Sequence, residues 1–212
     1  MSEASKTVSR LLYGPSYNPY EGLALLPFNG HGWASTGEAF PTIINRIKPK
    51  LIVEIGVWFG GSVRYMTQLA KVHNPDVEVV AIDTFLGSVE HWTKESYLMT
   101  LKNGRPTIYE QFMSNTIHQN LWENVTPFPV DSINGYEVLK KFNVHPDLIY
   151  IDAAHDYASV SADLERWSDL LATGGTLIGD DFHHPPIIEA VNDFFGPGTF
   201  ETINEKYVWT KK

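Results

Sequence analysis

The chain has 212 residues, of which 43% are hydrophobic and 19% charged, and this composition fits one globular domain that buries most of its apolar side chains. Its 25 acidic residues outnumber the 16 basic ones, and the formal net charge of −9 argues against nucleic acid or an anionic membrane as a partner. The absence of cysteine excludes disulfides and thiolate metal sites.

The first residues, MSEASKTVSR, lack the apolar core of a signal peptide, and no apolar run reaches membrane-spanning length. We therefore expect a cytoplasmic protein. Residues 1–36 show little periodicity and are rich in aromatic residues, Pro and Gly, especially over 13–20 and 27–33. We interpret them as an arm that crosses the domain, as a lid or as a contact in a homo-oligomer, and we expect residues 37–212 to form the main domain.

A helix is predicted over residues 36–47, because Phe40, Ile43, Ile44 and Ile47 have helical spacing. The next stretch, LIVEIGVWFGG at 51–61, begins with an apolar and mostly β-branched run that is typical of a strand buried on both faces. Its glycines predict a turn that lets the backbone approach a ligand, and residues 62–71 read as a helix. A second strand over 77–82 ends on Asp83, so this βαβ unit offers N–H groups and a carboxylate to a nucleotide.

The glycine loop departs from the dinucleotide-binding pattern G-x-G-x-x-G. In that pattern the middle glycine makes room for a pyrophosphate, and Trp58 stands at this place here. A bulky indole argues against a pyrophosphate lying on the backbone. A buried turn that binds no ligand is the alternative, and Asp83 at the end of the second strand favours a nucleoside ligand.

Further along, residues 86–106 are polar and cannot be assigned, and a helix is predicted over 108–120. A third strand over 125–130 contains Pro127 and Pro129, which favours a short strand or an edge position. Two βα units follow, with strands over 147–151 and 176–178, then a helix over 186–195 and a hairpin over 199–210. We predict an α/β fold: a Rossmann-like, doubly wound, mostly parallel seven-stranded sheet with a C-terminal antiparallel hairpin.

Acidic residues follow four of the predicted strands, and the carboxyl ends of parallel strands meet in one crevice. One such acid means little, since strand ends are polar. Several acids at one edge repel one another unless a cation or hydrogen-bond donors compensate. Helix N-caps are the alternative role for some of them. The acids are Asp83, Asp131, Asp152, Asp180 and Asp181.

Three motifs resemble those of a metal-dependent branch of the class I S-adenosylmethionine (SAM) methyltransferases. They are E-x-G-x-x-x-G-x-S at 54–62, IDAAHDY at 151–157 and GGTLIGDDF at 174–182. That branch includes macrolide-sugar and aminocoumarin-sugar O-methyltransferases, and cephalosporin-hydroxylase-like proteins resemble it. Caffeoyl-CoA and catechol O-methyltransferases use a similar metal trio. The resemblance covers the chain from about residue 44 to the C-terminus.

The resemblance implies a SAM site. Glu54 and Gly56 would flank the methionyl end, Asp83 would accept from the ribose hydroxyls, and Asp131 would accept from the adenine amino group. Trp58 would wall the pocket, although core packing is equally compatible with an indole. The full set implied for SAM is Glu54, Gly56, Val57, Trp58, Gly60, Ser62, Asp83, Thr84, Phe85, Asp131 and Ser132.

The resemblance also implies a metal site in which Asp152, Asp180 and Asp181 hold one divalent cation. All-oxygen ligands favour Mg²⁺, with Mn²⁺ and Ca²⁺ as alternatives. A metal-bound hydroxyl has a lower pKa and is fixed in line with the S–CH₃ bond. His155 matches the general base of the sugar O-methyltransferases, and a helix-capping role is its alternative. The His183–His184 pair either lines the acceptor pocket or lies on the surface.

We therefore expect a SAM-dependent and divalent-metal-dependent O-methyltransferase that acts on a small hydroxylated acceptor, such as a sugar, polyphenol or natural product. The acceptor pocket would be built from the arm, the stretch 86–106 and His183–His184. N-methylation and a macromolecular target stay open. The alternatives are an NAD(P)-dependent oxidoreductase and a non-methylating protein with the SAM fold, such as a hydroxylase-like relative or a binding subunit.

Overall fold

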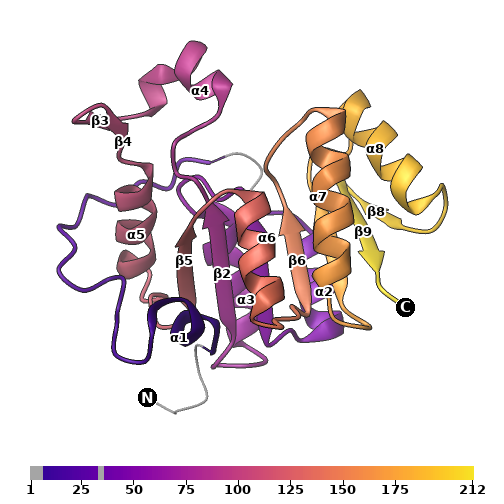
Figure 1. Ribbon diagram of the computed structural model, residues 1–212, viewed down its shortest axis with the longest axis horizontal. Coiled ribbons are helices and arrows are strands. Elements are labelled where there is room, and N and C mark those ends of the chain that lie inside the picture. Colours follow the sequence, from indigo (N-terminus) through magenta and orange to yellow (C-terminus); the bar gives the residue numbers. More distant parts are fainter. Residues whose placement is uncertain (1–6, 33–35) are drawn as a thin grey trace.

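The computed structural model describes residues 7–32 and 36–212 (Figure 1). Trp33 of the predicted arm therefore lies outside the described residues. A seven-stranded sheet forms the centre of the molecule, in the order β5-β2-β1-β6-β7-β9-β8. Five strands run parallel: β1 (Leu51–Ile55), β2 (Glu78–Asp83), β5 (Val125–Pro129), β6 (Leu148–Ile151) and β7 (Thr176–Gly179). The antiparallel hairpin of β8 (Glu201–Ile203) and β9 (Lys206–Thr210) completes the sheet beside β7.

Helices cover both faces of the sheet, with α6 and α7 in front of it and α2 and α3 behind it in Figure 1. The core accordingly has two parts. One part packs beneath α2 (Ala39–Ile47), α3 (Gly61–Lys71) and α5 (Ile108–His118), and the other beneath α1 (Thr7–Tyr13), α6 (Ser132–Lys141), α7 (Tyr157–Leu170) and α8 (Pro185–Phe195). Neighbouring strand residues alternate between the two parts, as Ile52 and Val53 do, because side chains of a strand point to opposite faces.

This architecture confirms the predicted fold class, including the reversed hairpin and the edge position of the proline-containing strand β5. Helix α6 begins at Ser132, because the Asp131 side chain accepts a hydrogen bond from the Asn134 N–H and caps it. Among the described residues, no helix is both long enough and apolar enough to cross a bilayer.

The stretch that the sequence left unassigned forms a small cap above the carboxyl ends of the strands (Figure 1). This cap, residues 86–107, contains α4 (Val89–Thr93), the 3₁₀ turn η1 (Ser96–Leu98) and a short hairpin of β3 (Leu101–Lys102) and β4 (Arg105–Pro106). Its elements are too short and too polar to show a periodic pattern in the sequence.

The described part of the arm runs from the amino end of the sheet along α5. Helix α1 begins at the Glu78 carboxylate, which accepts hydrogen bonds from the Val8 and Ser9 N–H groups. Further along, the Leu26 N–H donates to Ser114 and the Asn29 N–H donates to the side chain of Asn115, both on α5. The arm is therefore fixed to the main domain by backbone hydrogen bonds at both of these places.

Candidate active site

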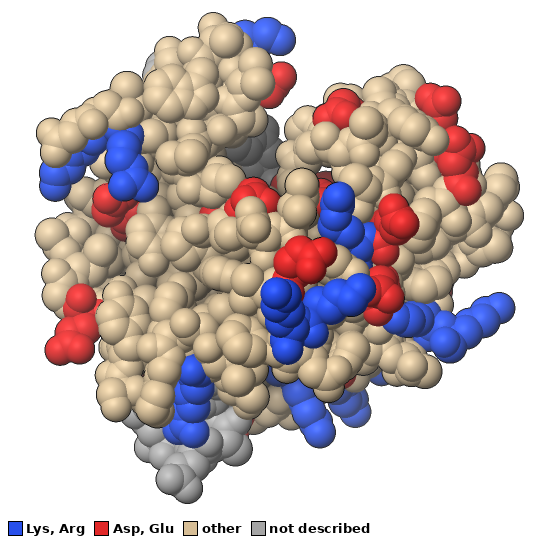
Figure 2. Space-filling view, viewed as in Figure 1, with Lys and Arg blue, Asp and Glu red and all other residues tan. Residues whose placement is uncertain are grey.

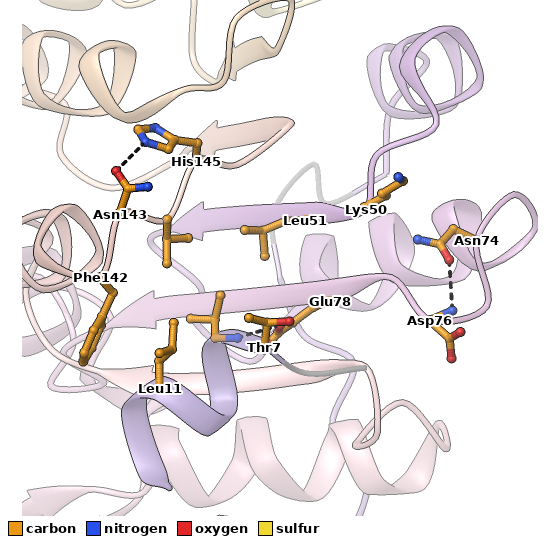
Figure 3. Close-up of a pocket in the computed structure, with 12 residues that line it drawn as sticks. Thr7, Leu11, Lys50, Leu51, Asn74, Asp76, Glu78, Phe142, Asn143 and His145 are labelled. Carbon is orange, nitrogen blue, oxygen red and sulfur yellow. Dashed lines mark hydrogen bonds between the residues drawn. The ribbon is translucent and has the colours of Figure 1, made fainter. Parts of the chain in front are cut away.

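A notch opens between the cap and the α7–α8 side of the molecule, and Asp and Glu side chains lie on its walls and floor (Figure 2). The carboxyl ends of β1, β2, β6 and β7 meet beneath it. A cavity of about 470 Å³ lies at the other end of the sheet, beside α1 (Figure 3). None of the residues implied for SAM or metal lines that cavity, so the notch is the candidate site.

Asp83 holds the glycine loop in place. Its Oδ2 accepts from the N–H groups of Val57 (2.8 Å) and Trp58 (3.0 Å), and its Oδ1 accepts from the Phe85 N–H (2.7 Å). Trp58 and Phe85 both have positive φ angles, of 51° and 54°, which non-glycine residues rarely adopt. The Asp83 carboxylate therefore stabilises two unfavourable backbone turns, one on each side of the predicted ribose position.

Position 56 must be a glycine because the end of the neighbouring strand β6 lies too close for a side chain. Its φ is +84°, and a Cβ atom there would lie 1.8 Å from the carbonyl oxygen of Asp152, at the end of β6. Any side chain would push β1 away from β6. The sequence interpretation gave this glycine the role of admitting a ligand, and the structure adds that it lets the chain after β1 pass directly against the backbone of Asp152.

Glu54 is fully buried, with 0% of its surface exposed, near the carboxyl end of β1 beneath the notch. The Ser62 hydroxyl donates to its Oε1, whereas no group among the described residues donates to its Oε2. Burial is the main reason why the pKa of Glu54 lies well above its ordinary value. A buried carboxyl group with one bare oxygen fits a cationic or N–H-donating ligand, and SAM carries both a sulfonium and an ammonium group.

The aspartates at the ends of β6 and β7 meet around Tyr150. Its hydroxyl donates to Asp180 Oδ2 at 2.6 Å and lies 3.1 Å from Asp152 Oδ2. The ammonium group of Lys206 donates to the same Asp180 oxygen, and the N–H of Asp181 donates to Asp180 Oδ1 at 2.8 Å. Both oxygens of Asp180 are therefore engaged by protein groups. Burial, followed by the charges of Asp180 and Asp181, raises the pKa of Asp152 to about 7.

His155 pairs with Asp181. Its Nε2 lies 3.0 Å from Asp181 Oδ2, and this hydrogen bond raises the pKa of His155 and lowers that of Asp181. The His184 ring lies parallel to the His155 ring with centroids 5.7 Å apart, and His183 lies beside His184. The structure thus brings all three histidines of the β6 and β7 loops to one wall of the site.

Asp152, His155 and Asp181 each offer a ligand atom within 4.8 Å of the others, which suits a single cation. Asp181, His183 and His184 form a second such group. A small cavity of about 10 Å³, lined in part by Asp152, Asp180 and Asp181, has room for one water-sized guest. Two of the three predicted metal ligands therefore converge, while Asp180 faces Lys206 instead.

The residues predicted to lie near the adenosine of SAM already contact other groups of the protein. Asp131 caps α6, as the alternative reading of the sequence allowed, and its Oδ2 accepts from the Asn134 side chain at 2.7 Å. Ser132 turns into the α6–α7 interface, where it donates to Asp163 and accepts from the Trp167 indole. Phe85 packs in the core against the rings of Tyr109 and Phe112, and the Thr84 hydroxyl accepts from the Leu86 N–H.

Three residues that the sequence analysis missed belong to this region: Tyr150, Lys206 and His91. Tyr150 lies two positions before Asp152, so the period of a strand already places both side chains on one face. The His91 ring of the cap stacks on Trp58 with centroids 4.1 Å apart and joins the cap to the glycine loop. Lys206 follows a hairpin turn and carries no signal in the sequence, because only the pairing of β9 with β7 brings it to Asp180.

A doubly wound sheet, a glycine loop after β1, a carboxylate after β2 and acids after β6 and β7 together define the class I methyltransferase fold. A family model described as a methyltransferase domain (Methyltransf_24) matches residues 53–182, which is more than half of the chain. The chain belongs to this family. Family and fold confirm the predicted class, a SAM-dependent methyltransferase, rather than the NAD(P)-dependent oxidoreductase.

Solved structures agree with this assignment of the fold. An O-methyltransferase from Bacillus cereus in complex with SAH has 16% identity and a TM-score of 0.60, with 88% of this chain and 84% of that chain covered. The O-methyltransferase NovP has 21% identity and a TM-score of 0.60, covering 82% and 78%. The calicheamicin methyltransferase CalS11 has 17% identity and a TM-score of 0.59, covering 81% and 77%. No curated protein matches the chain.

Proposed function

We propose that the protein is a divalent-metal-dependent O-methyltransferase, which transfers the methyl group of SAM to a hydroxyl group of a small acceptor such as a sugar, polyphenol or natural product. The observation that carries the proposal is the arrangement beneath the notch: the buried Glu54 Oε2 has no donor among the described residues, and Asp152, Asp181 and His155 lie within ligand distance of one another. The similar solved structures described as O-methyltransferases support oxygen as the acceptor atom.

The residues around the glycine loop would hold SAM, which supplies a methyl group on a sulfonium that an oxygen nucleophile can displace. Glu54 Oε2 accepts from its ammonium group and gains the donor that it lacks in the protein alone. Asp83 keeps the Val57 and Trp58 N–H groups in place and, through its remaining lone pairs, accepts from the ribose. Asp131 is proposed to contact the adenine, since its carboxylate lies at the rim.

Asp152 and Asp181 would supply carboxylate ligands to one divalent cation, Mg²⁺ or alternatively Mn²⁺ or Ca²⁺. Asp180, the third predicted ligand, is proposed to bind the cation more weakly, because Lys206, Tyr150 and the Asp181 N–H engage its two oxygens. A cation at this place lowers the pKa of an acceptor hydroxyl that binds it. It also offsets the mutual repulsion that raises the pKa of Asp152.

His155 is proposed as the general base. Its Nε2–H donates to Asp181 Oδ2, which leaves Nδ1 to take the proton of the acceptor hydroxyl. Asp181 then stabilises the imidazolium that forms, as the raised pKa of His155 implies. The cap and the His183–His184 pair, whose His184 ring stacks beside His155, are proposed to bind the acceptor. Exposed apolar side chains on the cap, Leu86, Val89 and Trp92, suit an acceptor with apolar surface.

The test is methyl transfer from radiolabelled SAM to a panel of vicinal diols, sugars and polyphenols, with and without EDTA. We expect EDTA-sensitive transfer to at least one acceptor class. His155→Ala should lower turnover by about 10²-fold with SAM affinity unchanged. The matched control is His73→Ala, which should leave turnover unchanged. His73 is exposed, pairs with Asn45 and precedes β2 at the end of the sheet opposite the notch. SAM binding without transfer to any acceptor would favour a non-methylating protein instead.

A further inference from the structure

Lys206 is a buried lysine at the edge of the carboxylate cluster. It is the first residue of β9, it is 4% exposed, and its ammonium group lies 5.2 Å from the ring centroids of Phe40 and Tyr150. The pairing of Tyr207 with Gly179 at the end of β7 places Lys206 next to Asp180. A hairpin turn normally presents lysine to solvent, so the burial of this side chain requires a reason within the site.

The contacts of Lys206 supply that reason. Its Nζ donates to Asp180 Oδ2 and, at 3.2 Å, to the hydroxyl oxygen of Tyr150. Both side chains of the Lys206–Asp180 pair are buried, whereas the Arg46–Glu201 and Lys140–Asp169 pairs lie on the surface. Taking an ammonium group out of water costs several kcal/mol unless a carboxylate and further hydrogen bonds compensate. Lys206 is therefore a fixed cation within a group of four carboxylates.

The consequence concerns the metal ligands. Of the four carboxylates at the notch, Glu54 faces the SAM position and Asp180 is held by Lys206 and Tyr150. Asp152 and Asp181 remain available, together with His155. Resting on the proposed function, we infer that Lys206 is a positioning residue, which binds Asp180 and restricts the divalent cation to the side of Asp152 and Asp181.

Such a restriction has a chemical use. A divalent cation such as Mg²⁺ takes about six oxygen ligands, and active sites commonly hold it by only one or two carboxylates so that substrate oxygens complete the set. A third carboxylate ligand would occupy a coordination position of the cation and reduce the positive charge that acts on the acceptor hydroxyls. Because Lys206 neutralises the charge of Asp180, the cation keeps more coordination positions and more of its positive charge for two adjacent acceptor oxygens than it would with three carboxylate ligands.

The test is a titration of the SAM-free protein with Mn²⁺, followed by electron paramagnetic resonance or calorimetry. Lys206→Met removes the charge and releases Asp180, so we expect Mn²⁺ to bind at least about 10-fold more tightly than to the wild type, because a carboxylate is gained and a positive charge is lost. Adding Asp180→Asn to Lys206→Met should return the affinity to the wild-type range. The matched control, Lys140→Met, removes a surface lysine that is also paired with an aspartate and should change nothing.

A merely structural role of Lys206 predicts the opposite sign, because a disturbed site binds the cation more weakly. Equal or weaker Mn²⁺ affinity of a folded Lys206→Met protein therefore overturns the inference. If circular dichroism shows that this variant is unfolded, Lys206→Gln removes the charge but keeps a donor to Asp180, and a smaller tightening of Mn²⁺ binding in the same direction is expected from the lost positive charge. Wild-type protein that binds SAM and methylates an acceptor but binds no Mn²⁺ overturns the role of Lys206 and the metal together. Absence of methyl transfer with tightened Mn²⁺ binding contradicts only the proposed function.

Discussion

Two buried glutamates on neighbouring strands have opposite surroundings. Glu78 begins β2 at the amino end of the sheet, is 5% exposed, and accepts from the N–H groups of Val8 and Ser9 and from the Thr126 hydroxyl, at 2.8–3.0 Å. Figure 3 shows it beside the start of α1. Glu54 on β1, near the carboxyl end, has the Ser62 hydroxyl on one oxygen and no donor from the described residues on the other.

This difference separates a structural acid from one kept for a ligand. Burying a carboxylate is tolerated when hydrogen bonds satisfy it, and the three donors at Glu78 do so while they fix the arm to the sheet. At the carboxyl end, Glu54 Oε2 has no donor among the described residues, and burial raises the pKa of both Glu54 and Asp152. These groups therefore gain stability when a cationic ligand arrives.

The largest effect should follow from Asp181→Asn. This change removes a carboxylate ligand and the partner of His155 together, so turnover should fall by about 10²-fold or more and lose its sensitivity to EDTA. SAM affinity, measured by calorimetry, should stay within about twofold, since Glu54 is untouched. Asp169→Asn, on a surface pair, serves as the control. Wild-type turnover in Asp181→Asn would remove this residue from the chemistry.

Glu54→Gln should weaken SAM binding by about 10-fold or more, because a hydrogen bond to a charged group contributes about 1.5–3 kcal/mol. The glutamine keeps the shape of the protonated side chain, so the free energy of unfolding without ligand should not fall. Denaturant unfolding of the variant gives its free energy of unfolding, and a SAM titration of the same preparation gives its SAM affinity. A variant that loses stability but keeps its SAM affinity would place Glu54 in the same class as Glu78.

Glu78→Gln should give the reverse pattern. The loss of charge weakens the hydrogen bonds from Val8, Ser9 and Thr126, so the free energy of unfolding should fall by about 1–3 kcal/mol. SAM affinity and turnover should match the wild type, since this residue lies at the opposite end of the sheet. Impaired SAM binding with unchanged stability would show that the two ends are not separate in function.

The last prediction concerns the pH dependence of stability. The folded pKa of Asp152 is about 7, above its ordinary value of 3.8, so the folded state holds a proton that the unfolded state releases between these values. The free energy of unfolding of the ligand-free protein should therefore decrease as the pH rises from about 4 to about 7. Asp152→Asn should flatten this dependence in urea denaturation at several pH values. A steeper dependence in the variant would mean that other groups dominate.

The sequence predicted what depends on local patterns. The apolar run that begins at Leu51 and the alternation of strands and helices after it were sufficient for the sheet. The acids after the strands come to one end of it, because the carboxyl ends of parallel strands meet there, and their role as a site stays a prediction. The cap was not predictable, because its elements span only a few residues each. Domain boundaries, the acceptor and the subunit contact of the arm stay predictions.

Pairings between distant parts of the chain limited the site prediction. Asp180 was expected to bind metal, but a lysine 26 residues later in the sequence engages it, and no local pattern encodes this contact. Ser132 follows the acid that caps α6, yet its hydroxyl serves the interface with Trp167. The bare oxygen of Glu54 is likewise a property of the folded site, since a sequence shows the acid and not its missing donor.

The most direct test of the central claim, that the undersatisfied carboxyl groups await cationic ligands, is calorimetric titration of SAM in buffers with different ionisation enthalpies. We expect SAM to bind with release of protons near pH 6, because Glu54 and Asp152 have raised pKa values and ionise when a cation is placed beside them. Glu54→Gln should release fewer protons. SAM binding without proton release, or no binding at all, would contradict the claim.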